Sequence, residues 1–186
     1  TPVYTSHIRS EGRGLLDAIA EVIAISRASG IRVQVSHLKT SGKNNWGLVD
    51  AALAKIRAAI AGGLDIHADR YPYTASDTDL DVILPPWASE GGQETVLARL
   101  KDRKVRQRLR DEIMEARGAD YWETIMIGST SHPLNRQFQG MRLVEAARRL
   151  GMEPVDAALH IAETDELKTG AFFFGMCEEN MFRILA

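Results

Sequence analysis

The chain has 186 residues, of which 45% are hydrophobic and 26% are charged, and its formal net charge is -2. This balance is typical of a globular protein with a sizeable core, and the small net charge argues against nucleic acids and anionic membranes as partners. The single cysteine, Cys177, excludes an internal disulfide and fits a reducing compartment, so we expect a cytoplasmic protein.

The first part of the chain alternates between strand-like and helix-like patterns. Strand-like runs at 2–8, 31–36 and 64–68 are separated by helical periodicity over 14–28 and 48–61, and a turn-rich loop covers 40–47. Strands that are joined by helices lie parallel and adjacent. This βαβαβ order therefore predicts a parallel sheet with right-handed crossovers.

The pattern changes after about residue 80. We expect a loop over 85–92, one charged helical stretch over 94–117, a strand over 123–128, helices over 141–150 and 154–163, a buried strand or turn over 171–176 and a helix over 178–186. These elements predict β/α units over 1–80, a mostly helical elaboration over 81–170, and a return to the first fold over 171–186. The chain starts in a strand pattern without an initiator methionine and stops in a helical one, so we expect an internal fragment of a longer protein.

Two histidines, His7 and His37, each follow a strand-like run in the same local context. Each is preceded by a serine and followed two positions later by a basic residue. Parallel neighbouring strands end at the same edge of a sheet, where α/β folds build active sites, so the two imidazoles should lie close together. Imidazole is the commonest metal ligand, and we predict that the pair shares a metal ion. A third candidate, His67, lies in mid-strand between Asp65 and Asp69, which favours a structural role.

Polar side chains also follow the second and third strands. Lys39 leaves the chain on the same side as His37, so it could recognise a substrate carboxylate, or it could be a surface lysine. Tyr71 could donate a hydrogen bond to a polarised carbonyl or a carboxylate, or it could pack as a buried aromatic residue. Three alternating acids that begin at Asp77 could bind a cation, although a solvated polar loop is the favoured interpretation.

Longer motifs combine these residues. They read SHIRSE at 6–11, SHLK at 36–39 followed by NWG at 45–47, and ADRYPYTAS at 68–76. Further matching pieces lie at 125–128, 154–159 and 170–174, so the similarity covers nearly the whole chain. In their order and spacing, these motifs resemble the N-acyl-D-amino-acid deacylases, or D-aminoacylases, of the amidohydrolase superfamily.

The resemblance implies an α/β fold, namely a partial TIM-like (β/α) barrel with a helical insertion, and a zinc site at the mouth of the barrel. His7 and His37 match two histidine ligands of the zinc, and His67 matches none. Lys39 and Tyr71 match positions associated with the substrate or its reacting carbonyl. Asp77 stands where the family often has a serine in a substrate-contacting loop, and an acid there disfavours an anionic substrate group.

Three parts of the family pattern have no counterpart in this chain. They are the cysteine ligand of the zinc, an early His-x-His pair, and the aspartate that acts as general base and acid. Cys177 lies in the wrong segment to replace the cysteine ligand. We therefore expect the isolated chain to bind zinc weakly or not at all and to lack hydrolytic activity.

For a full-length parent, the resemblance implies zinc-dependent hydrolysis of the amide bond of N-acyl-D-amino acids. Tyr71 would stabilise the oxyanion and Lys39 would hold this small-molecule substrate. The open sheet edges of the fragment require cover, which could come from the 80–170 region or from another copy of the chain in a homo-oligomer. Two alternatives stay open: a non-catalytic module with His7 and His37 in a small-ligand pocket, and another amidohydrolase such as a dihydroorotase-like enzyme. The latter usually has a carbamylated strand-end lysine between two metals, and no lysine is placed for that here.

Overall fold

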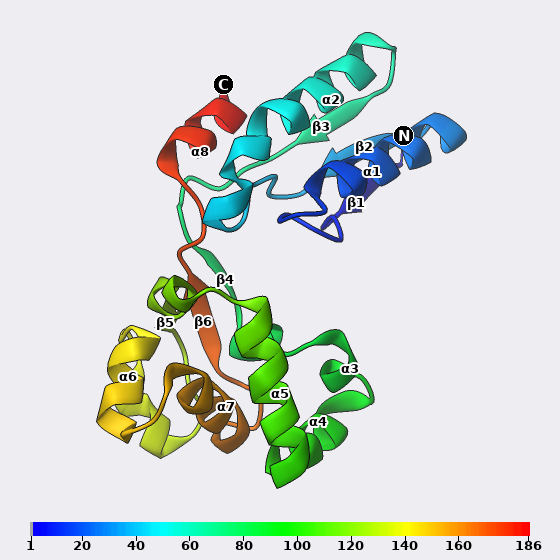
Figure 1. Ribbon diagram of the computed structural model, residues 1–186. Coiled ribbons are helices and arrows are strands. Elements are labelled where there is room, and N and C mark those ends of the chain that lie inside the picture. Colours follow the sequence, from blue (N-terminus) through cyan, green and yellow to red (C-terminus); the bar gives the residue numbers. More distant parts are fainter. Residues whose placement is uncertain (1) are drawn as a thin grey trace. The chain divides into compact units, whose positions relative to one another are not determined.

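A computed structural model describes residues 2–186, and Thr1 lies outside it. The chain divides into two compact units (Figure 1). The first unit consists of residues 2–75 together with Gly175–Ala186, and the second consists of Ser76–Phe174. The second unit is therefore inserted, in sequence, between two parts of the first. That the units correspond to a barrel and its insertion stays a prediction.

The first unit contains a three-stranded parallel sheet in the order β1-β2-β3. Its strands are β1 (Val3–Ser6), β2 (Arg32–Val35) and β3 (Ile66–Ala68). Ser6 pairs with Val35, and Val35 pairs with Ala68, so the three strands end level with one another. The predicted βαβαβ order and its parallel sheet are confirmed, and no closed barrel is present among residues 2–186.

Helices cover one face of this sheet (Figure 1). They are α1 (Leu15–Ser29) and α2 (Val49–Ala61). The buried side of α1 carries apolar residues at helical spacing, and they form one core with Val33, Val35 and Ile66 of the sheet. Alternation along a strand sends the neighbouring side chains to the opposite face, where Gln34 and His67 pair in register. That face is polar.

The last helix, α8 (Glu178–Leu185), returns to the first unit. Arg183 of α8 forms an ion pair with Asp50 of α2, and Ile184 lies beside Val49 and Leu53. The turn-rich segment expected as a loop over 40–47 is instead largely a 3-10 helix, η1 (Lys43–Leu48).

The second unit is built on an antiparallel sheet in the order β4-β6-β5. The strands are β4 (Ser76–Asp79), β5 (Ile125–Ile127) and β6 (Gly170–Phe173). Its α-helices are α3 (Pro86–Ser89), α4 (Gly92–Lys101), α5 (Arg103–Ala116), α6 (Leu143–Leu150) and α7 (Pro154–Thr164). Three 3-10 helices complete it: η2 (Leu80–Ile83), η3 (Ala119–Thr124) and η4 (Pro133–Phe138). A separate hydrophobic core fills this unit.

Three expectations for the second unit were wrong in detail. The charged stretch over 94–117 forms two helices, because the Asp102 carboxylate accepts hydrogen bonds from the backbone N–H groups of Lys104 and Val105 and starts α5. The expected loop over 85–92 contains α3, which begins at Pro86. The first two acids of the run that begins at Asp77 lie in strand β4, because pairing with β6 outweighs the poor strand propensity of aspartate, and the third lies in η2.

Among the helices of residues 2–186, none combines the length and the apolar character that crossing a lipid bilayer requires.

Candidate functional site

The structure brings His7 and His37 together at the carboxyl ends of β1 and β2. The strands end level, so the two residues leave the sheet at the same edge. Their ring centroids lie 4.4 Å apart, and Nε2 of His37 lies 2.5 Å from Nδ1 of His7. His7 is exposed and His37 is half-buried. Two ring nitrogens thus converge on one point that is open to solvent.

The backbone of His37 has an unusual conformation. Its φ is 43°, in the left-handed region that costs a non-glycine residue roughly 1–2 kcal/mol. The carboxylate of Asp69, which follows β3, holds this turn: Oδ1 accepts from the backbone N–H of His37 at 2.6 Å, and Oδ2 accepts from the Gln34 amide at 2.8 Å. Backbone strain of this kind clusters at functional sites.

This strain predicts an inequality between two substitutions of the same histidine. His37→Gly is expected to be more stable than His37→Ala by about 1 kcal/mol, because glycine adopts positive φ without a steric penalty. The free energy of unfolding, from urea denaturation followed by circular dichroism, measures the difference. Leu38, the next residue, serves as the control position. There we expect Leu38→Gly to be less stable than Leu38→Ala. Equal stability of the two His37 variants would contradict a strained turn.

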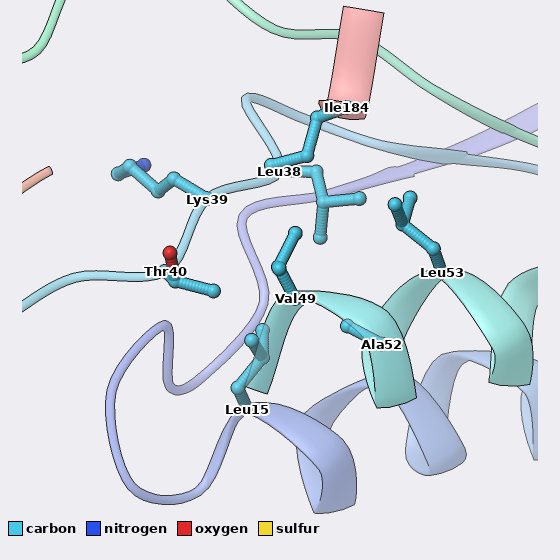
Figure 2. A pocket seen from close by; sticks show the side chains of 8 residues that line it. All are labelled: Leu15, Leu38, Lys39, Thr40, Val49, Ala52, Leu53 and Ile184. Carbon is cyan, nitrogen blue, oxygen red and sulfur yellow. The ribbon is translucent and has the colours of Figure 1, made fainter. Parts of the chain in front are cut away.

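Lys39 is buried, with 5% of its surface exposed, so it is not the surface lysine that was one of its two interpretations. Figure 2 shows Leu38 among the apolar side chains of the helices, and the Lys39 side chain extending away from them. The gap between those apolar side chains is too narrow for a water molecule, so it belongs to the packed core. Burial lowers the pKa of Lys39, and the hydrogen bond with Glu11 opposes that shift.

Glu11 joins His37 and Lys39 into one cluster. Its Oε1 contacts the Lys39 ammonium and lies 2.9 Å from Nδ1 of His37. The Lys39 Nζ itself lies 2.8 Å from the same Nδ1. A buried ammonium, a carboxylate and an imidazole therefore meet within hydrogen-bonding distance of one another.

Tyr71 lies beside this cluster. Its ring centroid is 6.4 Å from that of His37, and the Lys39 ammonium lies 5.5 Å from the ring. The guanidinium carbon of Arg70 is 4.3 Å from the same centroid. Burial raises the pKa of the Tyr71 hydroxyl. Tyr71 is half-buried, and the cationic groups of Lys39 and Arg70 lie near its ring.

Arg70 is buried and only partly satisfied. One of its terminal nitrogens donates to the carbonyl of Tyr73 at 2.7 Å and lies 2.9 Å from the Met176 sulfur. Its other two side-chain nitrogens have no acceptor among residues 2–186. The site edge is thus rich in cationic donors, which suits an anionic ligand.

The remaining sequence candidates lie elsewhere. Asp77 is exposed on β4, in the second unit. His67 is exposed on β3, where its Nε2 lies 2.8 Å from the Asp65 carboxylate. Cys177 is a free, half-buried cysteine at the start of α8. None of the contacts described for the His7–His37 pair involves these three residues.

Sequence reasoning missed three residues of the cluster: Glu11, Asp69 and Arg70. Each lies in a motif that carries another candidate, SHIRSE for Glu11 and ADRYPY for the other two. A charged residue just beyond a strand end was the available signal. Each, however, has a partner that is distant in the sequence: Lys39 lies 28 residues from Glu11, His37 lies 32 residues from Asp69, and Met176 lies 106 residues from Arg70.

The two imidazole nitrogens of His7 and His37 suit part of the ligand shell of a zinc ion. Two nitrogens on one tetrahedral zinc, bound at about 2.0–2.1 Å each, lie roughly 3.3 Å apart, so a small outward shift of the rings would admit the ion. Within residues 2–186, no three His, Cys, Asp or Glu side chains are grouped to hold a metal ion. The residues present therefore fit two positions of such a shell.

No protein-family model matches the chain. A curated protein, N-acyl-D-glutamate deacylase from Alcaligenes xylosoxydans xylosoxydans, is 32% identical over 182 residues, which is 98% of this chain and 29% of that protein. A solved structure of N-acyl-D-glutamate deacylase from Bordetella bronchiseptica, in complex with zinc and a phosphonate mimic of the tetrahedral intermediate, matches with a TM-score of 0.70 and 29% identity. A structure of D-aminoacylase matches with a TM-score of 0.63 and 30% identity. Both alignments cover 98% of this chain, which spans 30% of the length of each of those two proteins.

Proposed function

The chain is homologous to a segment of the D-aminoacylase and N-acyl-D-glutamate deacylase family, and on this premise we propose that it forms part of a zinc-dependent amidohydrolase. The substrate would be an N-acyl-D-amino acid, a small molecule whose amide bond is hydrolysed. The observation that carries the proposal is the pair of facing imidazole nitrogens at two neighbouring strand ends.

The first unit would be a partial TIM-like barrel. Three features support this architecture: parallel strands, helices on a single face, and a polar opposite face. Sheets that are wholly parallel are normally closed into barrels or covered on both faces, and within the first unit the helices α1 and α2 cover one face of this open sheet. Further β/α units beside β1 and β3 would complete the barrel, and the second unit would be its insertion.

His7 and His37 would hold the zinc, together with ligands from outside this chain. Bound zinc would polarise the scissile carbonyl and lower the pKa of a water molecule. The Tyr71 hydroxyl would donate a hydrogen bond to the developing oxyanion. The Lys39 ammonium would bind the substrate carboxylate. A carboxylate outside this chain would accept the proton of the water and return it to the leaving amine.

Asp77 would contact the substrate, and as an acid it would disfavour a second anionic group of the substrate near it.

Cytoplasmic location is proposed from the single cysteine alone. For the isolated chain, which lacks the further β/α units, a homo-oligomer would cover the open edges of β1 and β3.

Metal removal tests the proposed function. The full-length protein that contains this chain is assayed with a panel of N-acyl-D-amino acids and their L isomers, before and after chelation. We expect hydrolysis of D substrates, a loss of at least 100-fold in kcat/KM after chelation, and recovery with zinc. The L isomers serve as the matched control. Undiminished hydrolysis after complete metal removal, or no hydrolysis of any D substrate, would refute the proposal.

A further inference from the structure

The Nδ1 atom of His37 faces two groups with opposite hydrogen-bonding character. Glu11 Oε1 lies 2.9 Å away and Lys39 Nζ lies 2.8 Å away. An ammonium can only donate a hydrogen bond, and a carboxylate can only accept one. The two neighbours therefore cannot both be satisfied by the same state of a neutral imidazole.

Each neighbour favours a different tautomer of the ring. A neutral histidine carries one N–H and one lone pair on its two nitrogens. If Lys39 donated to Nδ1, the proton of His37 would sit on Nε2, the atom that faces His7. If Nδ1 carried the proton and donated to Glu11, the Nε2 lone pair would point toward His7 instead. Only the second tautomer can bind a metal through Nε2.

The contacts favour Glu11 in this competition. The Lys39 ammonium already contacts the Glu11 carboxylate, and it lies 3.2 Å from the backbone carbonyl of His37. Both are acceptors for its protons, so two of the three N–H groups of Lys39 have acceptors other than Nδ1. A hydrogen bond to a charged acceptor is also stronger than one between neutral groups. The Glu11 side chain is held in place, because only 20% of it is exposed.

We infer that Glu11 is a positioning residue, which fixes the Nδ1–H tautomer of His37 and directs the Nε2 lone pair toward His7. It does so in two ways: it accepts the Nδ1 proton, and it engages the ammonium that would otherwise donate to Nδ1. The inference rests on the proposed function only in assigning that lone pair to zinc. Carboxylates behind a ligating histidine orient the ring, and their loss typically lowers metal affinity by about 10–100-fold.

The tautomer can be measured directly, without metal and without activity. The 186-residue chain is labelled with ¹⁵N-histidine, and long-range ¹H–¹⁵N correlation spectra are recorded at about pH 8, above the ordinary histidine pKa of about 6.5. The His37→Gln spectrum assigns the signals of His37. We expect the Nδ1–H form in the unsubstituted chain. Finding the Nε2–H form there would overturn the inference, whatever the variants do.

Two matched variants separate the contributions of the neighbours. In Glu11→Met the acceptor is lost and the ammonium is released, so we expect His37 to convert to the Nε2–H form. In Lys39→Met the donor is lost and Glu11 remains, so we expect the Nδ1–H form to persist. An unchanged tautomer in Glu11→Met, or a converted one in Lys39→Met, would refute the inference.

Zinc titration of the full-length protein adds a second readout. Glu11→Met is expected to weaken zinc binding by about 10–100-fold, as measured by competition with a chromophoric chelator. Unaltered affinity in a protein that binds zinc would contradict the positioning of His37 by Glu11. If the unsubstituted protein binds no zinc, the proposed function fails while the tautomer experiment still decides the inference.

Discussion

Alanine in place of His37 is expected to weaken zinc binding by the full-length protein by roughly 100-fold or more, since even partners outside the ligand shell contribute 10–100-fold. Nε2 of His37 converges with Nδ1 of His7 at the strand ends, and its removal leaves one imidazole of the pair. Zinc content after equilibrium dialysis, determined by atomic absorption, measures the change. Hydrolysis of N-acyl-D-amino acids should fall in parallel.

His67→Ala is the matched control for this experiment. His67 is a histidine of the same sheet, exposed on β3 and hydrogen-bonded to Asp65. Its loss is expected to leave zinc content unchanged. Zinc stoichiometry that stays at the unsubstituted level in His37→Ala would exclude His37 as a ligand. Loss of zinc in His67→Ala would instead bring His67 into the metal site.

Asp165→Ala is expected to destabilise the second unit by about 3 kcal/mol or more, because each buried donor that loses its acceptor costs roughly 1–3 kcal/mol. Asp165 is 2% exposed. Its carboxylate accepts hydrogen bonds from the backbone N–H groups of Ser131 and His132 and from the hydroxyl of Thr169. It therefore ties the segment before η4 to the segment before β6.

The stability of the second unit can be followed through its own fluorophore. Trp122 is 3% exposed within the core of that unit, and with Trp46 of the first unit replaced by phenylalanine the tryptophan emission reports unfolding of the second unit. Guanidinium denaturation of Asp165→Ala should show an earlier transition at this probe. Asp111→Ala, on the exposed face of α5, is the control and should change the unfolding free energy by less than about 0.5 kcal/mol. Coincident transitions for Asp165→Ala and the unsubstituted chain would contradict the proposed hydrogen-bond network.

The sequence predicted best what depends on short-range patterns. The periodicity of α1 and the glycine at its end specify the helix locally, and Gly30 indeed ends it in the left-handed conformation. Strands alternating with helices then imply a parallel sheet whose ends meet at one edge. For this reason His7, His37 and Lys39 could be singled out as neighbours before the fold was known.

Features that depend on distant partners could not be predicted in this way. The four residues of β4 carry two aspartates and form a strand only because β6 lies beside them. Glu11 follows a strand end like many loop residues, and its importance depends on a side chain at Lys39. The left-handed turn at His37 has no glycine to indicate it, since Asp69, 32 residues further on, stabilises it.

The pairing of Ser76 with Phe173 affects how the two separate parts of the first unit come together in folding. Because β4 and β6 are hydrogen-bonded there, the folded second unit keeps its own entry and exit about one strand spacing, ~4.8 Å, apart. On the first unit, the N–H of Met176 correspondingly donates to the carbonyl of Thr74 at 3.3 Å. The folding of the second unit therefore offsets the entropy cost of closing the long segment Ser76–Phe174 into a loop. Helix α8 can then pack against α2 with the entropy cost of a short turn between β3 and α8, and not that of a long loop.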